Sequence, residues 1–197
     1  MQVLQALLLT LGSLLAVNGQ SFHLGRCPKP PVQLTFDVAK YMGRWYEIEK
    51  LPAAFELGKC NQATYTLKPE GVVQVVNAEL LSDGIVNEIV GTARVKDPSQ
   101  PAILEVSFFE GAPSAPYWVL STDYENYSLV YSCTNYLGFF YVDFAWILSR
   151  SRTLAATTVE QLRSTLTYNG ISVARMTATD QTGCAALSRS PAPAVAA

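Results

Sequence analysis

The sequence predicts an all-β protein: an eight-stranded antiparallel up-and-down barrel with one C-terminal α-helix packed on its outside. Eight segments of strand-like composition follow one another between residues 44 and 149, separated by turn residues such as Gly, Pro, Asn and Asp. Each segment leads directly back to its neighbour, which favours a barrel over a sandwich. After residue 156 the apolar residues recur at helical spacing. A barrel of eight strands has the size that holds one small ligand.

The composition of the 197-residue chain indicates one globular domain. Apolar residues make up 49% of the chain and charged residues 15%, and the net charge is −2. This balance provides no basic surface for nucleic acid, so a nucleic-acid partner is not expected.

The first 19 residues have the features of a secretory signal peptide. The run from Ala6 to Val17 is apolar but short for a membrane span, and small residues follow it. We expect cleavage between Gly19 and Gln20, with cleavage after Ala16 as a weaker alternative. The chain then divides into a signal peptide (1–19), a barrel domain (20–187) and a disordered Ala/Pro-rich tail (188–197). A secreted, extracellular protein is expected.

The mature chain contains four cysteines, an even number that predicts two disulfides in an exported protein. They are Cys27, Cys60, Cys133 and Cys184. Their spacing leaves all three pairings open, and it lacks the Cys-x-x-Cys pattern of a zinc or redox site. No metal and no cofactor are therefore expected.

The elements follow in order along the chain. Ser21 to Pro31 is a tail-like entry, and Asp37 to Met42 predicts one helical turn. The predicted strands are 44–49, 61–67, 72–80, 86–95, 103–109, 117–122, 127–133 and 139–149.

A helix of about a dozen residues is expected after the last strand. Thr157-Thr158-Val159-Glu160 fits a capping box at its start, and Asn169-Gly170 fits a C-terminal cap. Val159, Leu162 and Leu166 form its apolar stripe. Residues 171–176 are expected to form a ninth, short strand.

Strand alternation divides the barrel residues between an inner and an outer face. With Tyr65 pointing inward, the inner face is mostly apolar, as ligand pockets usually are. For any single residue, simple core filling explains the pattern equally well. The candidate ligand-binding residues are Tyr65, Asn77, Phe108, Trp118, Trp146 and Leu148.

Three separated segments resemble the lipocalin family. They are Gly43-Arg44-Trp45 before the first strand, Thr122-Asp123-Tyr124 between the sixth and seventh strands, and Arg150 after the last strand. The resemblance implies that Gly43, Trp45, Thr122, Asp123, Tyr124 and Arg150 close one end of the barrel. In that arrangement the Arg150 guanidinium stacks on the Trp45 indole, a favourable cation–π contact.

The resemblance also implies the pairings Cys27–Cys133 and Cys60–Cys184, and a monomeric carrier of small lipophilic ligands such as arachidonate or progesterone. An apolar rim that includes Phe109 and residues 137–140 is expected near the open end, where it touches a lipoprotein or membrane surface or folds over the mouth. Two other functions remain as alternatives: a receptor- or lipoprotein-docking module, and a prostaglandin-isomerase-like enzyme.

Catalysis is not expected, because no known catalytic motif is present and the cysteines are expected to be paired. The only histidine, His23, lies in the N-terminal arm, away from the expected pocket. Asn126-Tyr127-Ser128 is the only glycosylation sequon, which makes Asn126 a possible N-glycosylation site.

Overall fold

The computed structural model describes residues 21–187 except residues 110 and 112. The predicted signal peptide (1–19) and the predicted tail (188–197) lie outside the described residues. Within the described part of the chain, no helix is both long enough and apolar enough to cross a membrane.

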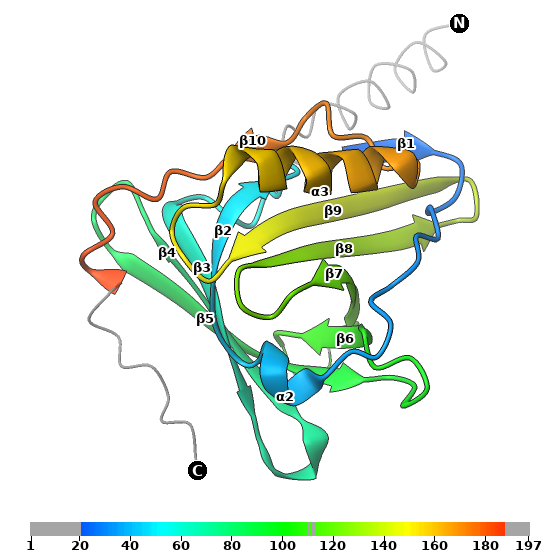
Figure 1. Cartoon of the computed structure of the whole chain (residues 1–197), viewed down its shortest axis with the longest axis horizontal. Coiled ribbons are helices and arrows are strands. Elements are labelled where there is room, and N and C mark those ends of the chain that lie inside the picture. Colours follow the sequence, from blue (N-terminus) through cyan, green and yellow to red (C-terminus); the bar gives the residue numbers. More distant parts are fainter. Residues whose placement is uncertain (1–20, 110, 112, 188–197) are drawn as a thin grey trace, which may run out of the picture.

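Eight antiparallel strands form the closed barrel that the sequence predicts (Figure 1). Each strand pairs with the next, and β9 pairs with β2 to close the ring. The barrel strands are β2 (Gly43–Lys50), β3 (Lys59–Leu67), β4 (Val73–Leu80), β5 (Val86–Val95), β6 (Ile103–Ser107), β7 (Ala115–Thr122), β8 (Tyr127–Tyr136) and β9 (Phe140–Ser149).

Two short strands extend the sheet, and neither was predicted. β1 (Ser21–Leu24) pairs with β9, where a tail-like entry was expected. β10 (Thr177–Ala178) pairs with β2, whereas residues 171–176, the predicted ninth strand, form none. Both additions depend on edges that only the folded barrel provides, so local sequence does not indicate them.

The helices lie near the predicted positions. α2 (Val38–Tyr41) is capped by the Asp37 carboxylate, which accepts from the N–H groups of Ala39 and Lys40. A one-turn 3₁₀ helix, η1 (Pro69–Gly71), joins β3 to β4. α3 (Ala156–Tyr168) ends at Asn169 and Gly170, as expected. The predicted capping box is wrong, because the N-cap is Ala155, whose carbonyl accepts from the N–H groups of Thr158 and Val159.

Two apolar clusters lie on opposite faces of the barrel wall. The inner cluster includes Trp45, Tyr65 and Leu148. The outer cluster joins Val159, Leu162 and Leu166 of α3 to β8 and β9, and Figure 1 shows α3 lying along these strands. The predicted helix stripe is therefore confirmed, and the strands beneath it are apolar on both faces.

The loops define the two ends of the barrel. Because neighbouring strands are antiparallel, alternate loops lie at the same end. The closed end, near Trp45, carries loops 68–72, 96–102 and 123–126, and the open end carries loops 51–58, 81–85, 108–114 and 137–139.

The disulfides are Cys27–Cys133 and Cys60–Cys184, which confirms the pairing that the resemblance implied. They account for all four cysteines of the sequence. The first fastens the N-terminal arm to β8, and the second fastens the C-terminal segment to β3.

Candidate functional site

The closed end is plugged by Trp45, whose side chain is fully buried. The Arg150 guanidinium lies over the indole ring, with 3.7 Å between its central carbon and the ring centroid. Arg150 also donates hydrogen bonds to the carbonyls of Lys40, Tyr41, Arg44 and Tyr124. One cation thus joins α2, β2 and the β7–β8 turn beneath the barrel.

Gly43 and the β7–β8 turn complete this plug. Gly43 has φ = +94°, and a Cβ there would lie 3.3 Å from the Arg150 guanidinium, so both its conformation and its surroundings favour glycine. The Thr122 hydroxyl donates to the carbonyl of Tyr127 and accepts from the N–H of Tyr124. Asp123 accepts from the N–H groups of residues 125–127, and these bonds lower the pKa of its carboxyl despite partial burial.

A chain of hydroxyl groups lies directly above the plug. The hydroxyl oxygens of Tyr65 and Tyr117 are 2.8 Å apart, and those of Tyr117 and Tyr41 are 2.9 Å apart. The Tyr41 hydroxyl is also 2.9 Å from the Ser128 hydroxyl. Burial raises the pKa of Tyr41 to about 12 and also raises the pKa values of Tyr65 and Tyr117. Three bonds use three of the four O–H protons, so one hydroxyl can donate to another acceptor.

The inner wall above these hydroxyls is apolar. Trp146, Phe108 and Tyr117 pack against the inner cluster but stay only partly buried, although they face the inside of a closed ring. These inner side chains are therefore not completely sealed from solvent. Gly91 makes room for Phe108, because a Cβ at Gly91 would meet that ring at 2.6 Å.

The structure brings five of the six predicted ligand-binding residues to this inner face. Tyr65, Phe108, Trp146 and Leu148 belong to or pack against the inner cluster. Asn77 lies opposite Ala63, which also packs there, so it shares the same face.

The sixth predicted residue, Trp118, is on the outer face, and its predicted inward orientation is wrong. Trp118 packs against the outer cluster, with its ring centroid 5.8 Å from that of Tyr131. Tyr117 and Val119 point inward instead. Both faces of β7 are apolar at this point, so strand alternation is compatible with either orientation. The larger aromatic, Trp118, was therefore assigned to the inner face, although it lies on the outer one.

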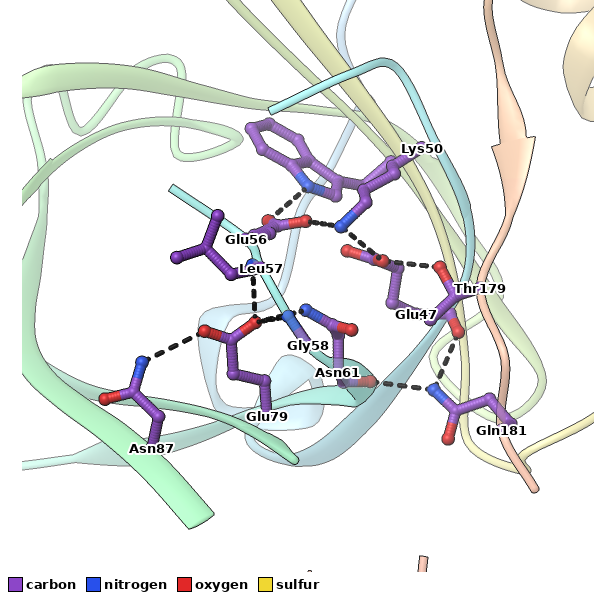
Figure 2. A network of polar contacts seen from close by, with 11 residues as sticks. Glu47, Lys50, Glu56, Leu57, Gly58, Asn61, Glu79, Asn87, Thr179 and Gln181 are labelled. Carbon is purple, nitrogen blue, oxygen red and sulfur yellow. Dashed lines mark hydrogen bonds and ion pairs between the residues drawn. The ribbon is translucent and has the colours of Figure 1, made fainter. Parts of the chain in front are cut away.

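A charged cluster of Glu47, Lys50 and Glu56 lies on the inner face near the open end (Figure 2). Glu47 is opposite Leu148 and Lys50 is opposite Trp146, so both face inward with these inner residues. The Glu56 carboxylate pairs with Lys50 through one oxygen and, through the other, accepts the Trp146 indole N–H at 3.1 Å. The three residues form a mixed-charge site beside the apolar wall.

Glu47 connects this cluster to the C-terminal segment. Its carboxyl accepts from the Thr179 hydroxyl and lies 3.3 Å from the Lys50 ammonium. Burial and the neighbouring Glu56 raise the pKa of Glu47 to about 8, against the opposing effect of Lys50. The Glu47 carboxyl therefore keeps its proton to a higher pH than an ordinary glutamate does.

A second carboxylate, that of Glu79, anchors the 51–58 loop (Figure 2). One of its oxygens accepts from the N–H groups of Leu57 and Gly58 at 2.9 and 2.6 Å, and the other accepts from the Asn87 amide. Gly58 is required here, because a Cβ would lie 2.5 Å from the Leu80 carbonyl oxygen. The base of the loop that carries Glu56 is thus fixed.

Sequence reasoning missed the cluster of Glu47, Lys50 and Glu56. A period of two places Glu47 on the face of Trp45, and this signal was available. A bulge at Ile48 then shifts the register, so the next inward residue after Glu47 is Lys50, three positions later, which strict alternation does not predict. Glu56 comes from a loop, whose side-chain direction has no periodic signal.

The lipocalin-like domain model matches residues 36–181, which include the plug, the inner wall and the charged cluster. The chain belongs to the lipocalin family.

Among curated relatives, this lipocalin closely resembles apolipoprotein D. It is 54% identical to the mouse protein over 173 residues, covering 88% of this chain and 92% of the relative. It is 56% identical to the bovine protein over 169 residues, covering 86% and 89%. The crystal structure of insecticyanin from the tobacco hornworm Manduca sexta aligns with a TM-score of 0.71 at 28% identity, covering 85% of this lipocalin and 92% of insecticyanin.

Proposed function

We propose that this lipocalin is a secreted carrier that binds one small lipophilic molecule inside the barrel. The observation that carries the proposal is the largely apolar inner wall, whose aromatic side chains are only partly buried, closed at one end by Trp45 and Arg150. Its likeness to apolipoprotein D, named as an apolipoprotein, supports a lipid ligand. Fatty acids such as arachidonate and steroids such as progesterone are the ligand classes to test.

The polar groups of the interior fit the polar end of such a ligand. Tyr65 ends the hydroxyl chain at the floor, and Asn77 lies higher on the wall. Either group can donate a hydrogen bond to a carbonyl or carboxylate while the rest of the ligand contacts Phe108, Trp146 and Leu148.

Lipid analysis tests the carrier function directly. Lipids extracted from the protein purified from its natural source are identified by mass spectrometry, and the delipidated protein is then titrated with each candidate. We expect a co-purifying lipid and saturable quenching of tryptophan fluorescence. Absence of both would contradict the proposal.

A docking function is the second candidate, supported by exposed apolar side chains on all four open-end loops. They are Phe55, Leu57, Ile85, Phe109, Leu137 and Phe139. An apolar rim of this kind fits a lipoprotein or membrane surface. The test is co-flotation with phosphatidylcholine vesicles, which we expect Leu137→Ser/Phe139→Ser to weaken; the matched Leu67→Ser change lies at the closed end. Equal flotation of all three proteins would contradict a role for the rim.

An isomerase-like activity is disfavoured by the state of the cysteines. Both disulfides are formed and leave no thiol as a nucleophile. His23 lies on the outer surface, where it bonds to Asp143 at 3.0 Å. Titration of the denatured, unreduced protein should find no free thiol, and one reactive thiol per chain would reopen this alternative.

We further propose that Asn126 carries an N-linked glycan when the protein is secreted. Asn126 is exposed at the tip of the β7–β8 turn, at the end opposite the ligand entrance. Ser128 of the same sequon is buried, so glycosylation has to precede folding of this turn. Treatment with an N-glycosidase should increase the mobility of the secreted protein but not of Asn126→Gln.

A further inference from the structure

The side chain of Glu56 occupies a position suited to the head group of an anionic ligand. Its two oxygens engage the Lys50 ammonium and the Trp146 indole N–H, and both donors face the barrel interior. A carboxylate held by one ammonium and one N–H is the pattern expected for recognition of a fatty-acid head group. Here the protein provides this carboxylate itself.

The donors remain suited to an anion if Glu56 leaves. With Glu56 in place, burial lowers the pKa of Lys50 but Glu47 and Glu56 together raise it above its ordinary value, so the site holds a charged ammonium that an incoming carboxylate can pair with in place of Glu56. Glu47 also lies 3.3 Å from Lys50, but burial raises its pKa and so weakens it as a counterion. The indole N–H of Trp146 only donates, so it can bond to the carboxylate of a ligand in place of that of Glu56.

The Glu56 side chain can leave without unfolding its loop. Leu51 is bonded to the Ala145 carbonyl at one end of the loop, and Leu57 and Gly58 are bonded to Glu79 at the other. Between these anchors, Ala54 and Phe55 are exposed, so Glu56 lies next to solvent at the barrel mouth. A rotamer change takes the carboxylate from the interior to water.

We infer that Lys50 and the Trp146 N–H form a carboxylate-binding subsite that Glu56 occupies in the unliganded protein and that an anionic lipid takes over by displacing it. The inference rests on the proposed carrier function and narrows it. Exchange of one carboxylate for another keeps the charge of the cluster constant. Glu56 therefore acts as an internal competitor that lowers affinity for fatty acids but not for uncharged lipids.

Matched ligands test this subsite. Oleate and oleyl alcohol have the same chain and differ in the head group, and both are measured by displacement of the neutral fluorophore N-phenyl-1-naphthylamine from the delipidated full-length protein. Glu56→Ala should strengthen oleate binding about five-fold, because the competing state is removed. Oleyl alcohol binding should change less than about two-fold.

Further variants locate the effect. Lys50→Met should weaken oleate about ten-fold relative to oleyl alcohol, the loss expected for one charged hydrogen bond. The double variant Lys50→Met/Glu56→Ala should lose the gain of Glu56→Ala. Trp146→Phe keeps an aromatic ring and loses the N–H donor. It gives a second measure of the preference for oleate over oleyl alcohol if Lys50→Met folds poorly. Glu125→Ala, an equal charge change at the closed end, is the control.

The outcomes separate this inference from the carrier function. Equal effects on oleate and oleyl alcohol, or a gain in Glu125→Ala as large as in Glu56→Ala, would overturn the subsite while leaving the carrier function intact. Failure of the fluorophore and both lipids to bind would overturn both.

Discussion

The guanidinium of Arg150 lies face-on against the indole of Trp45, at 3.7 Å from its ring centroid, and this pair closes the barrel. The contact positions a cation beneath a fully buried aromatic ring while the same cation binds backbone carbonyls from α2, β2 and the β7–β8 turn. Burial lowers the pKa of Arg150, but its ordinary value is high enough to keep it charged. The plug thus ties α2, β2 and the β7–β8 turn together at the closed end.

Replacement of Trp45 should therefore reduce stability. Trp45→Ala removes the largest fully buried side chain and leaves Arg150 without its aromatic contact. We expect a loss of about 3–5 kcal/mol in the free energy of unfolding, measured by chemical denaturation. Tyr168→Ala, at a residue 91% exposed, is the control and should change it by less than about 0.5 kcal/mol. A Trp45→Ala variant with the denaturation midpoint of the natural protein would refute the structural role.

Stability should depend on pH through Glu47. Its folded-state pKa is raised from 4.5 to about 8, so the folded protein binds the proton more tightly than the unfolded chain. The resulting stabilisation is fully present below about pH 4.5 and is lost as pH rises through about 8. Lys50 and Glu56 are the charged groups that face Glu47, and Thr179 is its neutral partner.

Thermal unfolding between pH 6 and pH 9 checks this effect. The natural protein should lose stability across this range, and Glu47→Gln, which keeps an acceptor for Thr179, should lose less. Parallel pH curves for the two proteins would show that Glu47 does not titrate in this range.

A bound lipid should quench the fluorescence of Trp146 and not that of Trp118. Trp146 lies on the inner wall, whereas Trp118 packs on the outer face against Tyr131. Trp118→Phe should keep most of the quenching produced by a bound lipid, and Trp146→Phe should lose most of it. The reverse result would place the ligand outside the barrel.

The Cys60–Cys184 disulfide should hold the C-terminal segment in the barrel wall. Residues 177–181 lie between β2 and β3 near the open end: Thr179 N–H bonds to Ile48, Cys60 N–H bonds to Asp180, and the Gln181 amide bonds to Glu47 and Asn61 carbonyls. Cys60→Ser/Cys184→Ser should cost about 2–5 kcal/mol in stability.

In the Cys60→Ser/Cys184→Ser variant, the rate of amide hydrogen exchange should increase selectively in residues 177–181 and in Ile48. The matched variant Cys27→Ser/Cys133→Ser frees the N-terminal arm instead, so it should leave exchange in this segment unchanged. Equal protection in both variants would show that hydrogen bonds alone hold the segment.

The sequence allowed the barrel, its eight strands, the outer helix, the plug and, by resemblance, both disulfides to be predicted, because each has a periodic or motif-based signal. Predictions failed where tertiary contacts decide. β1 and β10 exist only because β9 and β2 offer edges. Trp118 was assigned to the wrong face because α3 makes the outer side of this region as apolar as the inner side. The charged cluster was missed because a bulge and a loop bring its members together.

The insertion of residues 177–181 between β2 and β3 makes closure of the barrel wall depend on contacts that are distant in sequence. These two strands pair directly only from Gly43 to Tyr46, so the upper part of their seam is filled by the C-terminal segment. Thr179 lies 132 positions from its partner Glu47 along the chain, so the entropy of closing a long loop has to be offset before the wall is complete. Release of this segment would therefore open the barrel at its side, beside Glu47 and Asn61, and not at its mouth.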